Sequence, residues 1–238
     1  MSGPFHIDGA WPATTTLRRG WGKATARPWN HLTGEGSIRL IRGNTGFLED
    51  ATLWTANNAN GVVMSPALYR SATRIWRRVG YEKDIELQVM EKQLSAELQD
   101  LQRVEALGDR SNASLEEIDR LAFDDYWHMD GPGLQEAVDA TPRHQVFVAV
   151  VDGTPVGYAI VGVQVGISFL QRIAVVPAHQ GEGLGSELVH AGFRWAASNG
   201  ATTMLLNVRE ENAGARSLYR SLGFVDTKNI LEVLRYQA

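Results

Sequence analysis

The chain has 238 residues, 44% hydrophobic and 21% charged, so it can bury a core as one large domain or two small ones. Its net charge of −4 argues against a nucleic-acid partner, because nucleic acids select a basic protein face. The absence of cysteine excludes disulfides, thiolate zinc sites and a cysteine nucleophile.

No apolar run approaches the roughly 18 residues that cross a membrane. The first ten residues lack the basic patch and apolar run of a secretory leader. The six histidines are scattered, with no pair three or four residues apart. We therefore expect a cytoplasmic protein that binds neither a membrane nor a metal ion.

The first 60 residues show little periodicity, because Gly, Asn, Thr and Trp dominate them. Short strands are expected at Ser37–Ile41 and Ala51–Thr55. Residues 1–94 as a whole are not expected to form a large core of their own. A helix is predicted from Ser65 to Val79, since Pro66 suits a first helical turn. Alternation then predicts a strand over Ile85–Met90.

The remaining chain alternates between helical and strand patterns after a predicted linker at Ser95–Asp100. The Asp152-Gly153 pair predicts a tight hairpin between two of the strands. This order predicts a mixed α/β sheet flanked by helices. Helices are expected at Ser114–Phe123, Gly133–Ala140, Gly183–Ser198 and Ala213–Ser221, and strands at Leu101–Leu107, Gln145–Val151, Pro155–Val165, Ile167–Val176, Thr203–Val208 and Ile230–Tyr236.

A glycine-rich turn joins a predicted strand to a predicted helix at Gln180-Gly-Glu-Gly183-Leu-Gly-Ser186. Backbone N–H groups at a helix start lack intrahelical partners, and glycines let a phosphate approach them. The turn lacks the lysine of a P-loop. It also misses the last glycine of a dinucleotide fingerprint, because Ser186 or Leu188 occupies that position. A helix-capping turn that binds nothing is the alternative.

Two segments resemble the GNAT acetyltransferases over about residues 101–238. Gln180-x-x-Gly183-x-Gly185 resembles the family's Q/R-x-x-G-x-G/A loop. Asn212 to Phe224 is similar to its N-x-x-A-x-x-L-Y-x-x-x-G-F segment. The resemblance implies a mostly antiparallel mixed sheet and an acyltransferase that moves acetyl from acetyl-coenzyme A, its cosubstrate, to a primary amine.

The resemblance also implies roles for individual residues. Backbone groups of Ile173 and Val175 would pair with the pantetheine arm, and Asn212 would bind nearby. Tyr219 would contact the cofactor and protonate the departing thiolate, a role that suits a phenol of ordinary pKa (~10); an ordinary half-buried aromatic is the alternative. The pyrophosphate would lie on Gln180, Gly181, Gly183, Gly185 and Ser186. The other implied cofactor-binding residues are Ala174, Glu182, Leu184, Asn207 and Ala215.

The general base departs from the family pattern. Asn207 stands where relatives that acetylate ribosomal-protein N-termini carry glutamate, and an amide cannot accept the proton. Gln171 and Arg172 occupy the strand position where other members carry a glutamate. This loss keeps open a non-catalytic coenzyme A-binding sensor or scaffold, although Tyr219 and Asn212 favour the enzyme. The remaining base candidates, each also explicable as surface charge, are Asp124, Asp125, His128 and Glu210.

The N-terminal part contains a segment that repeats the C-terminal motif. Ala72–Tyr81 aligns without gaps on Ala215–Phe224, with Trp76 in place of the tyrosine and Tyr69 in place of the asparagine. We interpret residues 1–94 as a smaller, degenerate, partial GNAT copy packed against an acetyltransferase domain at 95–238. A chance likeness of two helix-turn-strand units is the alternative.

The degenerate copy is not expected to bind the cofactor, because Gly20-Trp-Gly22 lacks a convincing strand before it. In the C-terminal domain, Phe123–Met129 is expected to line the acceptor pocket, as the equivalent loop does in relatives. The amine acceptor stays open between a peptide N-terminus, a lysine and a small amine. The oligomeric state stays open between monomer and homodimer.

Overall fold

The computed structural model describes residues 4–95, 102–108 and 113–238. The predicted linker therefore lies almost wholly outside the described residues. The chain forms two compact units, Met1–Gln88 with Lys228–Ala238, and Val89–Thr227. Among the described residues no helix has both the length and the apolar character needed to cross a membrane.

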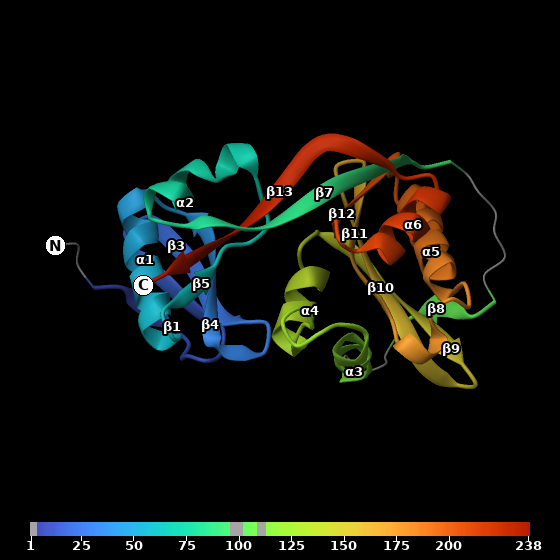
Figure 1. The fold of residues 1–238 in the computed structure, drawn as a ribbon, viewed down its shortest axis with the longest axis horizontal. Helices are drawn as coiled ribbons and strands as arrows, with labels where there is room; N and C mark the ends of the chain where they lie inside the picture. The colour runs from blue at the N-terminus through green and yellow to red at the C-terminus, as the bar shows by residue number, and fades with distance from the viewer. Residues whose placement is uncertain (1–3, 96–101, 109–112) are drawn as a thin grey trace. The chain divides into compact units, whose positions relative to one another are not determined.

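The second unit is a sheet with helices on both faces (Figure 1). Its strands follow the order β7-β12-β11-β10-β9-β8, and β11 and β12 form a parallel pair whereas β8–β9, β9–β10 and β10–β11 are antiparallel. The strands are β7 (Glu82–Gln93), β8 (Val104–Ala106), β9 (Arg143–Val151), β10 (Thr154–Gln164), β11 (Ile167–Val175) and β12 (Thr203–Arg209). The helices are α3 (Ala113–Ala122), α4 (Gly131–Val138), α5 (Leu184–Ser198) and α6 (Ala213–Ser221).

Strand β10 shows why both faces of this sheet are covered. Its residues Ala159 and Val161 belong to a core with α5, whereas Tyr158 and Ile160 belong to a second core with α3 and α4. Successive strand residues point to opposite faces, so one fully buried strand supplies two cores. The hairpin into β10 turns at Asp152 and Gly153, both with positive φ, as predicted.

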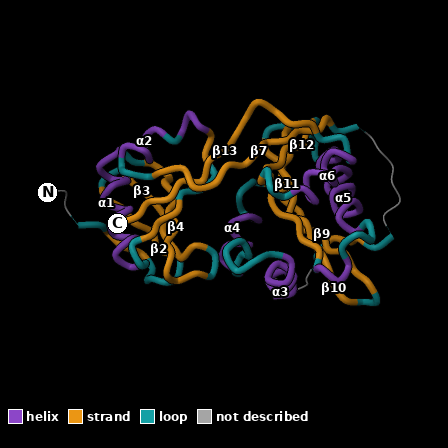
Figure 2. Tube along the Cα trace, viewed as in Figure 1, coloured by secondary structure: helices purple, strands orange, loops and turns teal. Residues whose placement is uncertain are grey.

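The first unit has its own core and its own run of neighbouring strands (Figure 2). The strand order is β1-β2-β3-β4-β5-β13, with β4 and β5 parallel and β6 paired to β13. The strands are β1 (His6–Asp8), β2 (Thr15–Arg19), β3 (Gly22–Trp29), β4 (Leu32–Arg42), β5 (Val62–Met64), β6 (Leu68–Tyr69) and β13 (Val225–Gln237). The helices are α1 (Thr45–Asn58) and α2 (Arg74–Arg78), and Arg70–Ala72 forms a 3-10 turn.

Three expectations for this segment were wrong. Ala51–Thr55 lies inside α1, whose Leu48, Ala51, Thr52 and Thr55 are buried at helical spacing. Residues 1–94 supply eleven of the twelve buried residues of a core, among them Leu17, Ile38 and Trp76, and β13 adds Leu234. A strand, β2, does precede Gly20. The pairing of distant segments, rather than local periodicity, builds this sheet, so the sequence pattern hides it.

The helix predicted over Ser65–Val79 is also wrong in its first half. Ser65 makes two hydrogen bonds to the backbone of Leu234. Its N–H donates to the Leu234 carbonyl (2.8 Å), and its Oγ accepts from the Leu234 N–H (2.8 Å). Leu68 and Tyr69 pair with β13 as β6. These backbone groups are therefore used in strand contacts, and helical structure begins only at Arg70.

The two units share an order of elements. In the first, the parallel strands β4 and β5 flank α1 in the chain, and α2 follows; in the second, β11 and β12 flank α5, and α6 follows. The aligned aromatic pairs adopt the same edge-to-face contact, Trp76–Tyr81 with centroids 5.0 Å apart and Tyr219–Phe224 with 5.8 Å. Gly80 and Gly223 both have positive φ. The repeat is thus present in the structure as well as in the sequence.

The last strands of the two halves are exchanged. Strand β7 follows α2 in the chain but lies beside β12, and its residues from Val89 onward belong to the second unit. Strand β13 follows α6 but pairs with β5, and its residues from Lys228 onward belong to the first unit. Each unit therefore needs both halves of the chain. The assignment of an acetyltransferase domain to 95–238 and of a degenerate copy to 1–94 stays a prediction.

Candidate active site

The candidate site lies where the parallel strands β11 and β12 separate. Strand β11 pairs with β12 only from Ile167 to Phe169, while on its other side it pairs with β10 along its length. An irregularity in the β10 register falls opposite Gln171. Beyond Phe169, the β11 backbone groups that point away from β10 therefore have no strand partner among the described residues.

The register identifies which groups these are. The N–H of Val176 donates to the Val156 carbonyl (2.9 Å), so 156 and 176 form a hydrogen-bonded pair. Antiparallel pairs alternate, so Gly157–Val175 and Ala159–Ile173 are non-hydrogen-bonded pairs. The backbone groups of Ile173 and Val175 thus face away from β10, whereas those of Ala174 face toward it. The two residues predicted to bind the pantetheine arm have the exposed backbone edge.

The glycine turn follows directly. Gly181 and Gly183 have φ of +83° and +85°, conformations that disfavour any residue with a Cβ. Gly183 begins α5 without a side-chain cap. The first helical bond runs from Glu187 N–H to the Gly183 carbonyl (3.1 Å), so the N–H groups of Gly183 to Ser186 precede it. Four backbone donors and the positive helix end therefore meet at one exposed turn.

Polar side chains around the glycine turn contact other groups of the protein. Gln180 donates from Nε2 to the Val175 carbonyl (3.0 Å). Glu182 lies 3.2 Å from His179 Nδ1, and Ser186 Oγ lies 3.4 Å from His190 Nδ1. Leu184 is buried in the core beneath the turn.

The second motif forms α6 with the bounds expected from the sequence. Asn212 caps this helix, because its Oδ1 accepts the Ala215 N–H (3.1 Å). Tyr219 is buried in the core that Ile173 and Val175 border. Within the described part of the chain its hydroxyl makes no hydrogen bond. Burial raises the pKa of Tyr219 to about 12, and the Arg172 charge acts in the opposite direction.

A buried charge network that the sequence did not predict lies on the α3–α4 face. Asp119 accepts two hydrogen bonds from Arg172, Nε to Oδ2 (2.9 Å) and Nη2 to Oδ1 (2.8 Å). It also accepts from the Tyr158 hydroxyl and the Met129 N–H (2.6 Å). Arg172 in turn donates to the Trp127 carbonyl (2.7 Å). Because Arg172 and Asp119 are 53 residues apart, no local pattern indicates their pairing.

This network holds the loop predicted to line the acceptor pocket. The Arg172 guanidinium lies over the Phe123 ring, with Cζ 3.7 Å from the ring centroid. The Arg209 guanidinium, from β12, lies over the Trp127 ring at 4.6 Å by the same measure. Arg172 and Arg209 come from the two strands that part. The loop between α3 and α4 is therefore fastened to both of them.

The base candidates have different surroundings. Asp124 accepts the Trp127 N–H at Oδ1 (3.1 Å), so it stabilises the turn after α3. Asp125 and Glu210 are exposed, whereas His128 is 9% exposed. Asn207 is exposed on β12. His128 thus combines a titratable ring with burial in this loop.

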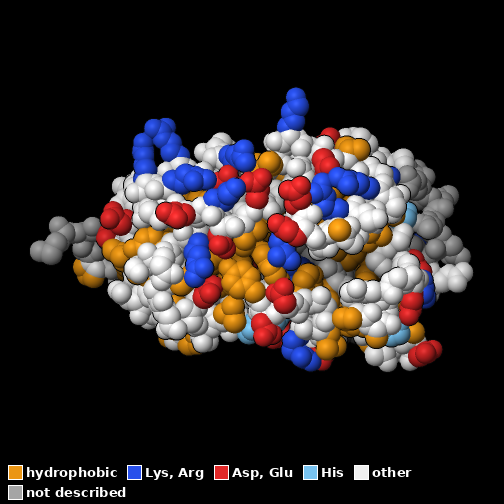
Figure 3. Space-filling model, in the orientation of Figure 1, with side chains coloured by type: hydrophobic (Ala, Val, Ile, Leu, Met, Phe, Trp, Pro, Cys, Tyr) orange, Lys and Arg blue, Asp and Glu red, His pale blue; other side chains and the backbone are white. Residues whose placement is uncertain are grey.

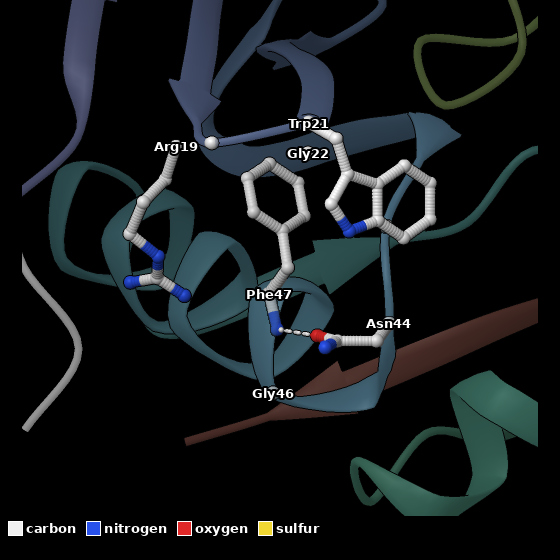
Figure 4. A pocket seen from close by; sticks show the side chains of 8 residues that line it. Arg19, Trp21, Gly22, Asn44, Gly46 and Phe47 are labelled. Atoms are coloured by element: carbon white, nitrogen blue, oxygen red, sulfur yellow. Dashed lines mark hydrogen bonds between the residues drawn. The ribbon is translucent and has the colours of Figure 1, made fainter.

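The first unit has a hollow of about 390 Å³ at the start of α1 (Figure 4). Here the helix end is capped, because Asn44 Oδ1 accepts the Phe47 N–H at 2.9 Å, and the Phe47 ring points toward Gly22. A Cβ at Gly43 would lie 2.6 Å from the Phe47 ring. Asn44 is thus the N-cap of α1, as Gly183 is of α5. Unlike Gly183, it caps its helix with a side chain, and the Phe47 ring lies nearby. The hollow is lined by Arg19, Gly20, Trp21, Gly22, Gly43, Asn44, Gly46 and Phe47.

Comparison with known proteins agrees with this geometry. Residues 112–224 match the model of the acetyltransferase (GNAT) family. The mycothiol acetyltransferase of Renibacterium salmoninarum is 32% identical over 118 residues, which are 49% of this chain and 32% of that protein. The ribosomal protein bS18-alanine N-acetyltransferase of Escherichia coli is 37% identical over 82 residues, 34% of this chain and 55% of that protein. The chain thus matches about a third and about half of these relatives' lengths.

Among solved structures, a tandem GNAT protein from the clavulanic acid biosynthesis pathway covers 99% of this chain and 85% of its own, with a TM-score of 0.62 and 12% identity. This likeness shows the fold, including its duplication. The family match includes the parting strands, the glycine turn and the Asn212–Phe224 segment. Residues 112–224 of the chain are a domain of the acetyltransferase (GNAT) family.

Proposed function

We propose that the chain transfers an acetyl group from acetyl-coenzyme A directly to a primary amine. The observation that carries the proposal is the backbone edge of β11 at Ile173 and Val175, which has no strand partner among the described residues and leads to the uncapped start of α5. An extended amide-containing arm attached to a pyrophosphate matches these two features in that order. Acetyl-coenzyme A has this chemistry.

The cofactor would replace contacts that the protein now makes with itself. A pantetheine amide pairing with the Val175 carbonyl would displace the Gln180 side chain, which now donates to it. The released Gln180 amide could then donate to the pyrophosphate on the N–H groups of Gly183 to Ser186. Asn212 is positioned by its capping bond at the start of α6.

The chemistry requires one bond made and one broken. The amine nitrogen attacks the thioester carbonyl, the tetrahedral intermediate collapses, and the C–S bond breaks. Tyr219 donates its phenolic proton to the departing thiolate. Burial raises the pKa of the phenol by disfavouring its anion, and it would disfavour a thiolate formed beside it for the same reason, so the proton transfer stays feasible. The chain has no cysteine to carry an acyl group, which favours direct transfer.

The amine must lose a proton before or during attack. Of the four base candidates we favour His128, because it is buried in the loop between α3 and α4 and an imidazole is the side chain best suited to proton transfer near neutral pH. A water molecule could connect it to the amine. Asn207 could orient that water by hydrogen bonding but could not take the proton.

The acceptor is a small molecule or a peptide carrying a primary amine. The relatives' names include mycothiol, aminoglycosides and an alanine of a ribosomal protein, so the family match alone does not select among them. On the face in view in Figure 3, basic and acidic side chains are intermixed, which favours a compact acceptor over a nucleic acid. We place the reaction in the cytoplasm, since the chain has no cysteine to form disulfides.

We propose one cofactor site per chain. In the first unit, the Asn44 side chain already caps the start of α1, and the Phe47 ring fills the space beside Gly22 and Gly43. A pyrophosphate there would compete with the cap and displace the ring. The first unit would then serve the fold by supplying β7 to the sheet of the second unit.

Acceptor-dependent release of free coenzyme A thiol tests the activity. A panel would include an N-terminal peptide, a lysine peptide, an aminoglycoside and a polyamine. Wild type should release thiol with at least one acceptor, and Gly183→Glu should release none. The matched control is Gly153→Glu, which places the same charge at another positive-φ glycine with open space around it. Coenzyme A binding without thiol release for any amine would support a sensor instead.

A further inference from the structure

The proposed pyrophosphate turn has an electrostatic difficulty. Between Gln180 and Glu187 it contains two carboxylates, Glu182 and Glu187, and no lysine or arginine. Glu187 lies in the first turn of α5, beside the backbone donors that the pyrophosphate would use. A carboxylate there stabilises the helix by interaction with its positive end but competes with and repels a bound anion.

Arg103 contacts this turn from a distant part of the sequence. Its Nε donates to Glu187 Oε1 (2.9 Å), and its Nη2 donates to the same oxygen. Its backbone N–H donates to Glu187 Oε2 (3.3 Å). Both carboxylate oxygens of Glu187 are therefore engaged, and the side chain of Glu187 is only 16% exposed.

The same guanidinium also holds the loop itself. Arg103 Nη2 donates to the Glu182 carbonyl (2.9 Å), which lies between the left-handed Gly181 and Gly183. A Cβ at Gly183 would lie 3.8 Å from this nitrogen. The guanidinium thus lies at the turn where the proposed anion would bind.

The Arg103 backbone is held in place by hydrogen bonds of the sheet. Its own carbonyl accepts the Val150 N–H of β9 (2.8 Å), and β8 begins at the next residue and pairs with β9. The side chain therefore extends from the hydrogen-bonded sheet edge to the first turn of α5. A glycine turn with two left-handed residues has little stiffness of its own, so an external anchor matters for its shape.

We propose that Arg103 is a positioning residue of the cofactor site. It neutralises Glu187, fixes the Glu182 carbonyl, and so makes the turn acceptable to a pyrophosphate. This inference rests on the proposed function, because it assumes that coenzyme A binds at this turn. It assigns Arg103 no step in the chemistry.

The test measures coenzyme A dissociation constants by calorimetry on the full chain. Arg103→Gln should raise the dissociation constant about tenfold, a value discounted because the Arg103 side chain is 37% exposed. Turnover at saturating acetyl-coenzyme A should be nearly unchanged, so KM rises while kcat does not. Dephospho-coenzyme A, which keeps the pyrophosphate, should show the same loss.

A double variant separates electrostatics from loop folding. Adding Glu187→Gln to Arg103→Gln removes the unpaired carboxylate, and affinity should return to within about threefold of wild type. Arg120→Gln is the matched control, since it breaks the exposed Arg120–Glu117 pair on α3 and should leave the constant unchanged.

The outcomes distinguish the two levels of the proposal. If Gly183→Glu loses coenzyme A but Arg103→Gln binds it as wild type does, the role of Arg103 is refuted and the cofactor site stands. If the double variant binds no better than Arg103→Gln, neutralisation of Glu187 is refuted. If the wild type itself binds no coenzyme A, the proposed function fails together with this inference.

Discussion

Replacement of Asp119 by alanine should strongly destabilise the second unit. The Asp119 side chain is fully buried, and the Arg172 side chain that it pairs with is 11% exposed. The variant leaves a buried guanidinium without a carboxylate, next to uncharged partners such as the Trp127 carbonyl, the Phe123 ring and the Tyr158 hydroxyl. It also leaves the Tyr158 hydroxyl and the Met129 N–H without their acceptor.

Removing one member of a buried ion pair costs about 3–5 kcal/mol, because the remaining charge is uncompensated. We expect Asp119→Ala to lower the free energy of unfolding by about this amount. Replacing both partners, as in Asp119→Ala with Arg172→Met, should cost clearly less than the single change, since no charge is then stranded.

Urea unfolding followed by circular dichroism at neutral pH measures these differences. Glu117→Ala is the matched control on the same helix, because its ion pair with Arg120 is exposed on both sides and should contribute less than about 0.5 kcal/mol. If Asp119→Ala and Glu117→Ala lose similar small amounts, the buried network does not stabilise the fold as argued.

The other predictions concern the reaction and the strand exchange. Tyr219→Phe should lower turnover roughly 10²-fold with little change in acetyl-coenzyme A affinity; equal turnover, with chemistry rate-limiting, would remove Tyr219 from the mechanism. Burial raises the pKa of Tyr219 to about 12, and the phenol is a competent acid only below its pKa. A kcat profile should therefore show no loss from this group up to about pH 10, and an apparent pKa near 9 that disappears in Tyr219→Phe would contradict this. A fragment of residues 95–238 lacks β7 and carries β13 without its partner β5, so it should aggregate or unfold; a stable, fully active fragment would refute the structural need for the exchange.

The C-terminal motifs could be predicted from the sequence because their residues act locally. The Asp152-Gly153 turn, the glycine turn before α5 and the whole of α6 depend on short-range chemistry, namely positive φ, helix ends and a capping asparagine. The mixed α/β sheet flanked by helices follows from the order of these elements. These parts of the fold were predicted correctly.

The N-terminal part could not be predicted in the same way. Its strands β2, β3 and β4 contain glycine, proline and polar residues, and they are stabilised by pairing with each other around Leu17 and Ile38. Ser65 is not helical as predicted, because its hydrogen-bonding groups pair with Leu234, 169 residues away. Contacts of this range carry no periodic signal.

The same limit explains the candidate site. The sequence indicated Ile173, Gly183 and Tyr219 through motif positions, but not Arg103 or Asp119. Arg103 meets Glu187 across 84 residues, and Asp119 meets Arg172 across 53. An arginine and an aspartate outside any motif are ordinarily solvated surface charges, so only the fold shows these contacts.

Calorimetric titration with acetyl-coenzyme A, comparing wild type with Gly183→Glu and with the matched control Gly153→Glu, is the decisive test of the proposed cofactor site. We expect one site per chain in wild type and in Gly153→Glu. We expect no measurable binding in Gly183→Glu, where a carboxylate and a Cβ enter the turn at φ +85°. Equal binding by Gly183→Glu, or two sites per chain in wild type, would refute the proposed site.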